Sequence, residues 1–315
     1  AIFIFYGSIK NMKKFSNIEF CFPDIKSNSK EIITKEIVGI IKENQSLSYC
    51  GFADEKTAIE NICKNLGGGK TNGYKPVSDK QKKQIEKIVE NVLKKSNEFL
   101  EIPTKQYIFV LPYFPNKSQK VFNGVYGYAV YSCVFYLFVD LKSFSKKSLE
   151  NTVVHELNHT IYFYRHFDGF GNYTLLDNLI LEGLAENFRK DVLGGVLPPW
   201  TKSLDKTESL NILSDYTSIL MSKDLQLIND FLFGSKKFKK WTGYSAGFHL
   251  VREFIKCNPN FSWEKIMKTK IKEFQKILYY HQKMIKFSYQ ICTLQRQELP
   301  LDAKLLKSNF YKLCF

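Results

Sequence analysis

The 315-residue chain has little arginine, although its formal net charge is +15. Lysine therefore carries nearly all of the positive charge, and it is spread along the whole chain and mixed with glutamate. Recognition of phosphates and bases favours the planar fork of arginine over the point charge of lysine. The scarcity of arginine therefore argues against direct nucleic-acid binding. The four arginines are Arg165, Arg189, Arg252 and Arg296.

Cysteine occurs in an odd number, and no CxxC pair is present. The cysteines are widely scattered, which argues against a disulfide framework and against a cysteine-based zinc site. We expect reduced, mostly buried thiols in a cytoplasmic protein. The seven positions are Cys21, Cys50, Cys63, Cys133, Cys257, Cys292 and Cys314.

The chain also lacks the run of about 20 apolar residues that a membrane-spanning helix needs. The N-terminal AIFIFYG is too short for the core of a signal peptide, and no basic segment precedes it. The longest apolar stretch, AVYSCVFYLFV at 129–139, is rich in β-forming residues and predicts a buried strand. We therefore expect a soluble protein with no membrane span, while its oligomeric state stays open.

Apolar residues at spacings of three and four predict two amphipathic helices, over 30–43 and 78–100. Ser78 stands where an N-cap is expected for the second. Between the two helices, the GGGKT of segment 65–76 invites a phosphate-loop interpretation. That motif requires glycine at the position that Lys64 occupies, so we expect a flexible loop instead.

Runs of β-branched and aromatic residues over 106–114 and 124–141 predict the strands of a sheet. A helix follows, with Ser148 as its expected N-cap, and the glycine-rich break at 167–172 ends it. Together with the helical N-terminal part, this order predicts an α+β fold. Further helices are predicted over 175–193, ending at Gly194, and over 204–233, 243–257 and 262–286.

The stretch TVVHELNHTI places His155 and His159 four positions apart on a predicted helix. Residues i and i+4 share one face of a helix, so both imidazoles can point at one metal ion. Glu156 projects near the same ion without reaching it, which suits a general base. The pattern indicates a hydrolase in which zinc-activated water attacks a carbonyl. An ordinary helix that happens to carry two histidines is the alternative, although burying such a pair is costly without a partner.

A catalytic zinc site also needs a third protein ligand. The HExxHxxGxxH pattern does not supply it, because Tyr162 and Arg165 occupy its glycine and third-histidine positions. His166 lies about 16 Å beyond His155 along a continuous helix, which is too far to share the ion.

The following helix offers two carboxylates, Glu182 and Glu186, one turn apart in LEGLAENF. We expect Glu182 to be the third ligand. Glu186 is then placed to accept the N–H of a ligating histidine, with His155 as the expected donor. The reverse assignment of the two glutamates stays open.

HELNH, LLDNLILEGLAENF and GYSAGFHLVREF follow one another in the chain, and together they resemble the bacterial predicted zinc-dependent proteases of the domain of unknown function 2268 family. EGLAENF is also similar to the EGxAxxF element of gluzincin aminopeptidases. The resemblance covers roughly residues 105–275. It implies a zincin-like (gluzincin) fold with a small mixed sheet beside the HExxH helix. It also implies one Zn2+ per chain, with His155, His159 and Glu182 as ligands and Glu156 as general base.

On this resemblance, we expect residues 101–315 to form a zincin-like metallopeptidase domain with a helical C-terminal subdomain. Residues 1–100 lie outside the resemblance, and we expect a helix-rich region of unclear role there. The expected substrate is a peptide or protein. The alternative function is a basic, non-catalytic module that binds nucleic acid or an anionic surface, with a structural metal or none. The intact Glu156 argues against it, because a structural zinc site does not require a general base.

Two further elements are candidates for supporting roles. The segment GVYGYAVY at 124–131 is a candidate edge strand that holds a peptide by β-augmentation, with glycines that allow close backbone approach; a plain core strand is the alternative. Tyr244 and His249 are candidate donors to the oxyanion of the attacked carbonyl. We prefer Tyr244, against a role in helix packing alone.

Overall fold

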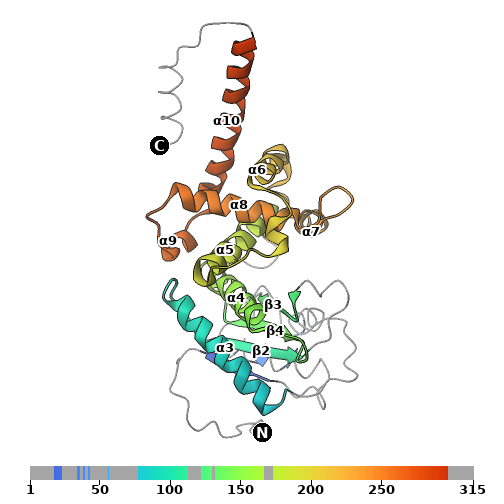
Figure 1. Cartoon of the computed structure of the whole chain (residues 1–315), viewed down its shortest axis with the longest axis vertical. Helices are drawn as coiled ribbons and strands as arrows, with labels where there is room; N and C mark the ends of the chain where they lie inside the picture. The colour runs from blue at the N-terminus through green and yellow to red at the C-terminus, as the bar shows by residue number, and fades with distance from the viewer. Residues whose placement is uncertain are drawn as a thin grey trace. The chain divides into compact units, whose positions relative to one another are not determined.

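The computed structural model describes residues 18–22, 77–112, 122–129, 132–166 and 173–296, and single positions between 34 and 56. Within 285–296 it describes the backbone alone. The chain divides into two compact units, and most of their elements are labelled in Figure 1. The first takes in residues 1–171 and 191–193, and the second takes in 172–190 and 194–315.

The first unit contains a four-stranded mixed sheet with the strand order β1-β2-β4-β3. Strands β1, β2 and β4 run parallel, whereas β3 is antiparallel to β4. Every residue of β4 is buried, as its apolar sequence predicts. The sheet and the many helices confirm the predicted α+β class. The strands are β1 (Ile18–Cys21), β2 (Gln106–Pro112), β3 (Val125–Ala129) and β4 (Val134–Val139).

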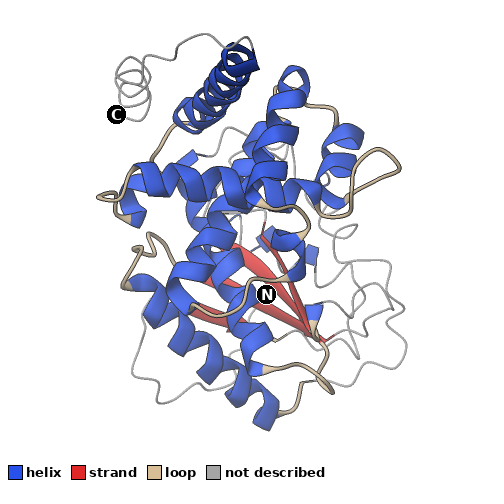
Figure 2. Ribbon diagram, turned by 45° about the horizontal axis from the view of Figure 1, so that its top comes forward, coloured by secondary structure: helices blue, strands red, loops and turns tan. Residues whose placement is uncertain are grey.

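Helix α3 (Asp79–Asn97) begins at the predicted N-cap. The Ser78 hydroxyl accepts the N–H of Gln81, and the Gln81 side chain accepts the N–H of Ser78, which forms a capping box. The helix packs beside the next one, α4, which in turn packs on β3 and β4. Figure 2 shows the strands behind these helices.

Helix α4 (Lys146–His166) carries the two histidines, and its start corrects one prediction. We expected Ser148 to be the N-cap, but Ser148 lies inside the helix and donates its own N–H to the hydroxyl of Ser145. The Ser148 hydroxyl instead donates to the carbonyl of Phe122, just before β3. Two serines three positions apart are equivalent in sequence, and this tertiary contact separates their roles.

The second unit is helical in its described residues, and its first helix has the predicted bounds. Thr174 and Asp177 form a capping box at the start of this helix, and Gly194 ends it with a φ of 64°. Its last turn, residues 191–193, is grouped with the first unit. The helices are α5 (Leu175–Leu193), α6 (Lys206–Asp215), α7 (Leu225–Phe233), α8 (Thr242–Cys257), α9 (Trp263–Met267) and α10 (Ile271–Arg296), with short 3-10 helices η2 (Pro199–Lys202) and η3 (Thr217–Ile219).

Some predicted segments lie outside the described residues. The loop at 65–76 and the break at 167–172 are among them, as is most of the helix predicted over 30–43. The division predicted at residue 100 stays a prediction. No helix in the described part of the chain is both long and apolar enough to cross a bilayer. Among the described thiols, burial raises the pKa of Cys133 to about 12, so this group is unreactive.

Helices α5 and α8 approach each other so closely that their backbones touch. A Cβ atom added to Gly183 would lie 2.2 Å from the carbonyl oxygen of Gly247, and one added to Gly247 would lie 2.1 Å from the carbonyl oxygen of Leu179. The buried amide of Asn187 donates to the carbonyls of Gly183 and Phe248, one on each helix. Glycine is therefore required on both helices at this crossing.

Replacing Gly247 with alanine tests this contact. The added methyl group meets backbone rather than a movable side chain, so Gly247→Ala should lower the free energy of unfolding by more than about 2 kcal/mol. Chemical denaturation measures the change. Gly39→Ala is the matched control, because a Cβ there meets nothing within 4 Å and the helical backbone favours alanine. Equal stability of the two variants would show that the helices separate easily.

Candidate metal centre

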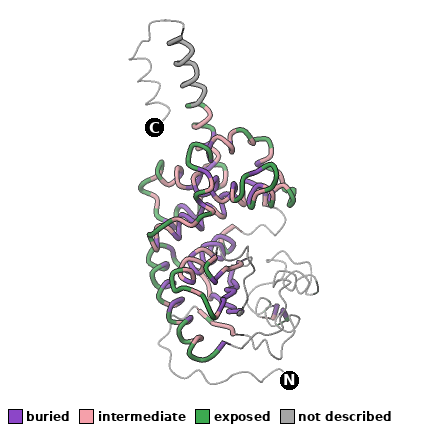
Figure 3. Tube along the Cα trace, turned by 45° about the vertical axis from the view of Figure 1, so that its right-hand side comes forward, coloured by how far each residue is buried: buried purple, intermediate pink, exposed green. Residues whose placement is uncertain are grey.

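The motif lies in the most buried part of α4. Residues 156–163 are all buried, while His155 is half-buried and Tyr164 is exposed. This stretch appears in purple in Figure 3. A helix buried on nearly every side is normally apolar throughout. This one instead places polar side chains in the interior, which requires them to have partners there.

His155 and His159 face each other from successive turns of α4, as the spacing predicts. Their Nε2 atoms are 3.0 Å apart, and their ring centroids are 4.6 Å apart at an interplanar angle of 87°. A metal ion held by both Nε2 lone pairs requires each neutral ring to carry its proton on Nδ1. The pair thus presents two nitrogens to one point.

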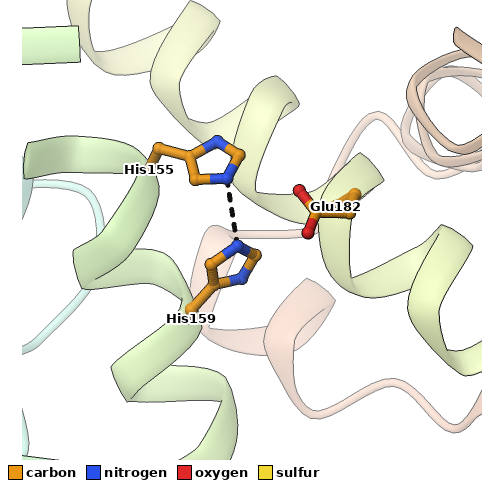
Figure 4. Close-up of side chains that lie close together, drawn as sticks. All are labelled: His155, His159 and Glu182. Atoms are coloured by element: carbon orange, nitrogen blue, oxygen red, sulfur yellow. Dashed lines mark hydrogen bonds between the residues drawn. The ribbon is translucent and has the colours of Figure 1, made fainter. Parts of the chain in front are cut away.

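Glu182 on α5 completes a group of three that could hold a metal ion. One ligand atom from each of His155, His159 and Glu182 lies within 4.8 Å of the others, and Figure 4 shows the arrangement. Bonds of zinc to nitrogen and oxygen are about 2.0–2.2 Å long, so two ligand atoms on one tetrahedral ion lie about 3–4 Å apart. The 3.0 Å separation of the two nitrogens is at this lower bound. The donor set fits zinc, and the two nitrogens already have the spacing that a zinc ion needs.

Glu186 lies one turn beyond Glu182 and is almost fully buried, at 1% exposure. One of its oxygens accepts the Nε–H of Arg189 at 2.9 Å, and the other accepts the indole N–H of Trp200 at 2.8 Å. Arg189 is itself 3% exposed, so the two form a buried ion pair. The contacts with Arg189 and Trp200 do not test the predicted hydrogen bond from His155 to Glu186, which stays a prediction.

Glu156 lies on α4 beside strand β3. Its side chain is buried, and a Cβ added to Gly127 of β3 would lie only 2.3 Å from the Cγ atom of Glu156. Burial and, second, the negative charge of Glu156 raise the pKa of the neighbouring Tyr128. Both observations place the candidate general base against the middle of β3.

The two candidate oxyanion donors lie on α8. The ring of Tyr244 lies 5.8 Å from that of Phe233 and 5.7 Å from that of Trp241, measured between centroids. Burial lowers the pKa of His249, and a hydrogen bond to the backbone of Leu204 offsets part of that shift. Neither contact tests the predicted catalytic role.

Comparison with known proteins gives one family and one relative. Residues 85–276 match the model of the family described as "Predicted Zn-dependent protease (DUF2268)". A protein of Bacillus subtilis (strain 168), "Uncharacterized protein YjfC", is 24% identical over 152 residues, which cover 45% of this chain. The matched residues cover 50% of that relative, so the chain spans about half of its length. No solved structure matches.

Two residues around the centre, Arg189 and Trp200, were not found from the sequence. Arg189 stands three positions after Glu186, a helical spacing at which an ion pair could have been predicted. Trp200 lies beyond the Pro198–Pro199 turn, and no local spacing rule connects it to Glu186. Gly127 was identified for close backbone approach, but its contact with Glu156 depends on how β3 and α4 pack.

Replacing Arg189 tests how much the buried ion pair with Glu186 contributes to the free energy of unfolding. Arg189→Met leaves the Glu186 carboxylate buried without its charge partner and should lower the free energy of unfolding by about 3–5 kcal/mol. The double variant Glu186→Leu/Arg189→Met removes both charges and should regain much of that loss. Urea denaturation of the four proteins in this cycle measures the coupling. Additive losses would mean that the two side chains do not interact.

Proposed function

Because the chain belongs to the family of predicted Zn-dependent proteases, we propose that it is a zinc metallopeptidase of the HExxH, gluzincin type. The observation that supports this most is the convergence of His155, His159 and Glu182 to within 4.8 Å. The proposed reaction is hydrolysis of a peptide bond in a peptide or protein.

His155, His159 and Glu182 are the proposed ligands of one zinc ion per chain. When bound, the ion polarises the carbonyl to be attacked and increases the acidity of water. The two histidines supply neutral nitrogen donors, and Glu182 supplies a negative charge that offsets part of the charge of the ion. Glu186 is the proposed acceptor for His155, which would fix the tautomer of that ring.

Glu156 is the proposed general base. It follows His155 directly on α4, so it projects near the ligand nitrogens without sharing their direction. Its carboxylate would accept a proton from the attacking water and deliver it to the departing amine. Tyr244 is the proposed donor of a hydrogen bond to the oxyanion.

Strand β3 is the proposed binding edge for the substrate backbone. Among the described strands it pairs with β4 alone, which leaves it at the edge of the sheet. The N–H of Asp140 donates to the carbonyl of Gly124, and bonding positions alternate in an antiparallel pair. Residues 125, 127 and 129 therefore direct their N–H and C=O groups away from β4. An extended peptide could pair with them, with Gly127 next to Glu156.

Replacing Glu156 with glutamine tests the proposed activity. The amide cannot accept the proton, so turnover should fall by at least about 10²-fold while close to one zinc per chain is retained. A peptide-library cleavage assay and metal analysis measure the two quantities. Glu150→Gln is the matched control, because it makes the same change on α4 at a residue that pairs with Lys146 on the surface.

The same experiments distinguish the proposed peptidase from the alternative function. A wild-type protein that binds no metal would refute the proposal. So would peptide cleavage that Glu156→Gln leaves unchanged. Binding of nucleic acid or anionic vesicles that falls steeply with salt and ignores Glu156→Gln would favour the basic, non-catalytic module.

The order of zinc affinities should identify the third ligand. Glu182→Ala removes a proposed ligand, whereas Glu186→Ala removes a group that orients one, a loss that typically costs about 10–100-fold in affinity. Glu182→Ala should therefore weaken zinc binding more. Competition with a chromogenic chelator measures both, with circular dichroism to verify that each variant is folded. The reverse order would exchange the two assignments.

A further inference from the structure

Gly127, in the middle of β3, lies directly against the side chain of Glu156. A Cβ atom built on Gly127 would lie 2.3 Å from Cγ, 2.6 Å from Oε1 and 2.7 Å from Cδ of Glu156. Favourable separations between carbon atoms are about 3.5–4.0 Å. Glu156 can therefore occupy its position only if residue 127 has no side chain.

The backbone does not explain why this residue is glycine. Gly127 is not among the residues with positive φ, so any L-amino acid could adopt its conformation. It pairs with Leu137 in a regular antiparallel register, where glycine is less favourable than a β-branched or aromatic residue. The three atoms nearest to the added Cβ all belong to Glu156. The closest contacts that exclude a side chain at position 127 are therefore those with Glu156.

We propose that Gly127 is a positioning residue for Glu156, and that the missing side chain leaves the space in which the carboxylate rests against the edge strand. Glutamate has three rotatable side-chain bonds and needs contacts to hold a single conformation. Buried at 6% exposure, Glu156 has the β3 backbone as one wall of its site. Its catalytic consequence rests on the proposed function, whereas the placement itself does not.

A methyl group at position 127 should displace the carboxylate. Relief of a 2.3 Å contact requires a shift of about 1 Å or more, and Glu156 is the group that can move, since its side chain is flexible and β3 is fixed by its pairing. A displacement of this size can reduce a reaction rate by about 10²-fold. The three atoms nearest to the added Cβ belong to Glu156 rather than to His155 or His159, so we expect the metal ligands to stay in place.

The experiment compares wild type, Gly127→Ala, Glu156→Gln and the double variant. Gly127→Ala should retain zinc and KM while kcat falls by about 10²-fold. In the Glu156→Gln background the same substitution should change turnover less than twofold, because it acts through Glu156. Equal losses in both backgrounds, or a loss of zinc, would overturn the proposal in favour of a purely structural role for Gly127. Gly39→Ala controls for the chemical change.

Crystal structures of wild type and Gly127→Ala supply a readout that does not depend on activity. The Glu156 carboxylate should move by at least about 1 Å, into another rotamer, while the α4 backbone stays in place. An unmoved carboxylate would refute the positioning role, even in an active enzyme. If wild type cleaves no peptide but the carboxylate moves, the proposed function fails and the positioning role of Gly127 stands.

Discussion

Burial of polar side chains in α4 is the constraint on which the rest of the structure depends. A helix satisfies its own backbone groups, but the buried side chains of Glu156, Asn158 and His159 need polar contacts of their own. Each such group must meet another element or a neighbour on its own helix. The facing nitrogens of His155 and His159 are one such contact within α4, and Glu156 lies against β3.

Positions without a side chain are a second constraint on the packing. Gly127 admits a carboxylate next to a strand, and Gly183 and Gly247 let two helix backbones touch. Gly183 directly follows Glu182, so the tightest part of the α5 and α8 crossing lies next to a proposed ligand. Backbone atoms have no rotamers, so the backbone contacts between α5 and α8 hold the two helices rigidly. This rigidity favours a fixed direction for the neighbouring Glu182 side chain.

Helices α3 and α5 were predicted well from sequence, because their signals are local, whereas the helix predicted over 204–233 is interrupted between α6 and α7. The bounds of α5 follow from Thr174, from regular apolar spacing and from Gly194. The spacing of His155 and His159 likewise carries its own geometry. The prediction of Ser148 as the N-cap of α4 was wrong, because its hydroxyl contacts Phe122, which lies far away in the sequence. The bond from Trp200 to Glu186 depends on where the chain turns after α5, which no pattern in the sequence specifies.

The shortness of β3 has a consequence for association between chains. An exposed strand edge can template the addition of another copy as readily as the binding of a peptide. β3 has five residues, and three of them direct backbone groups outward. That length can hold a short extended peptide, yet it gives a second strand few hydrogen bonds with which to begin a continuous intermolecular sheet. The short length of the β3 edge therefore favours a short peptide over a second copy of the chain, independently of any side-chain contact.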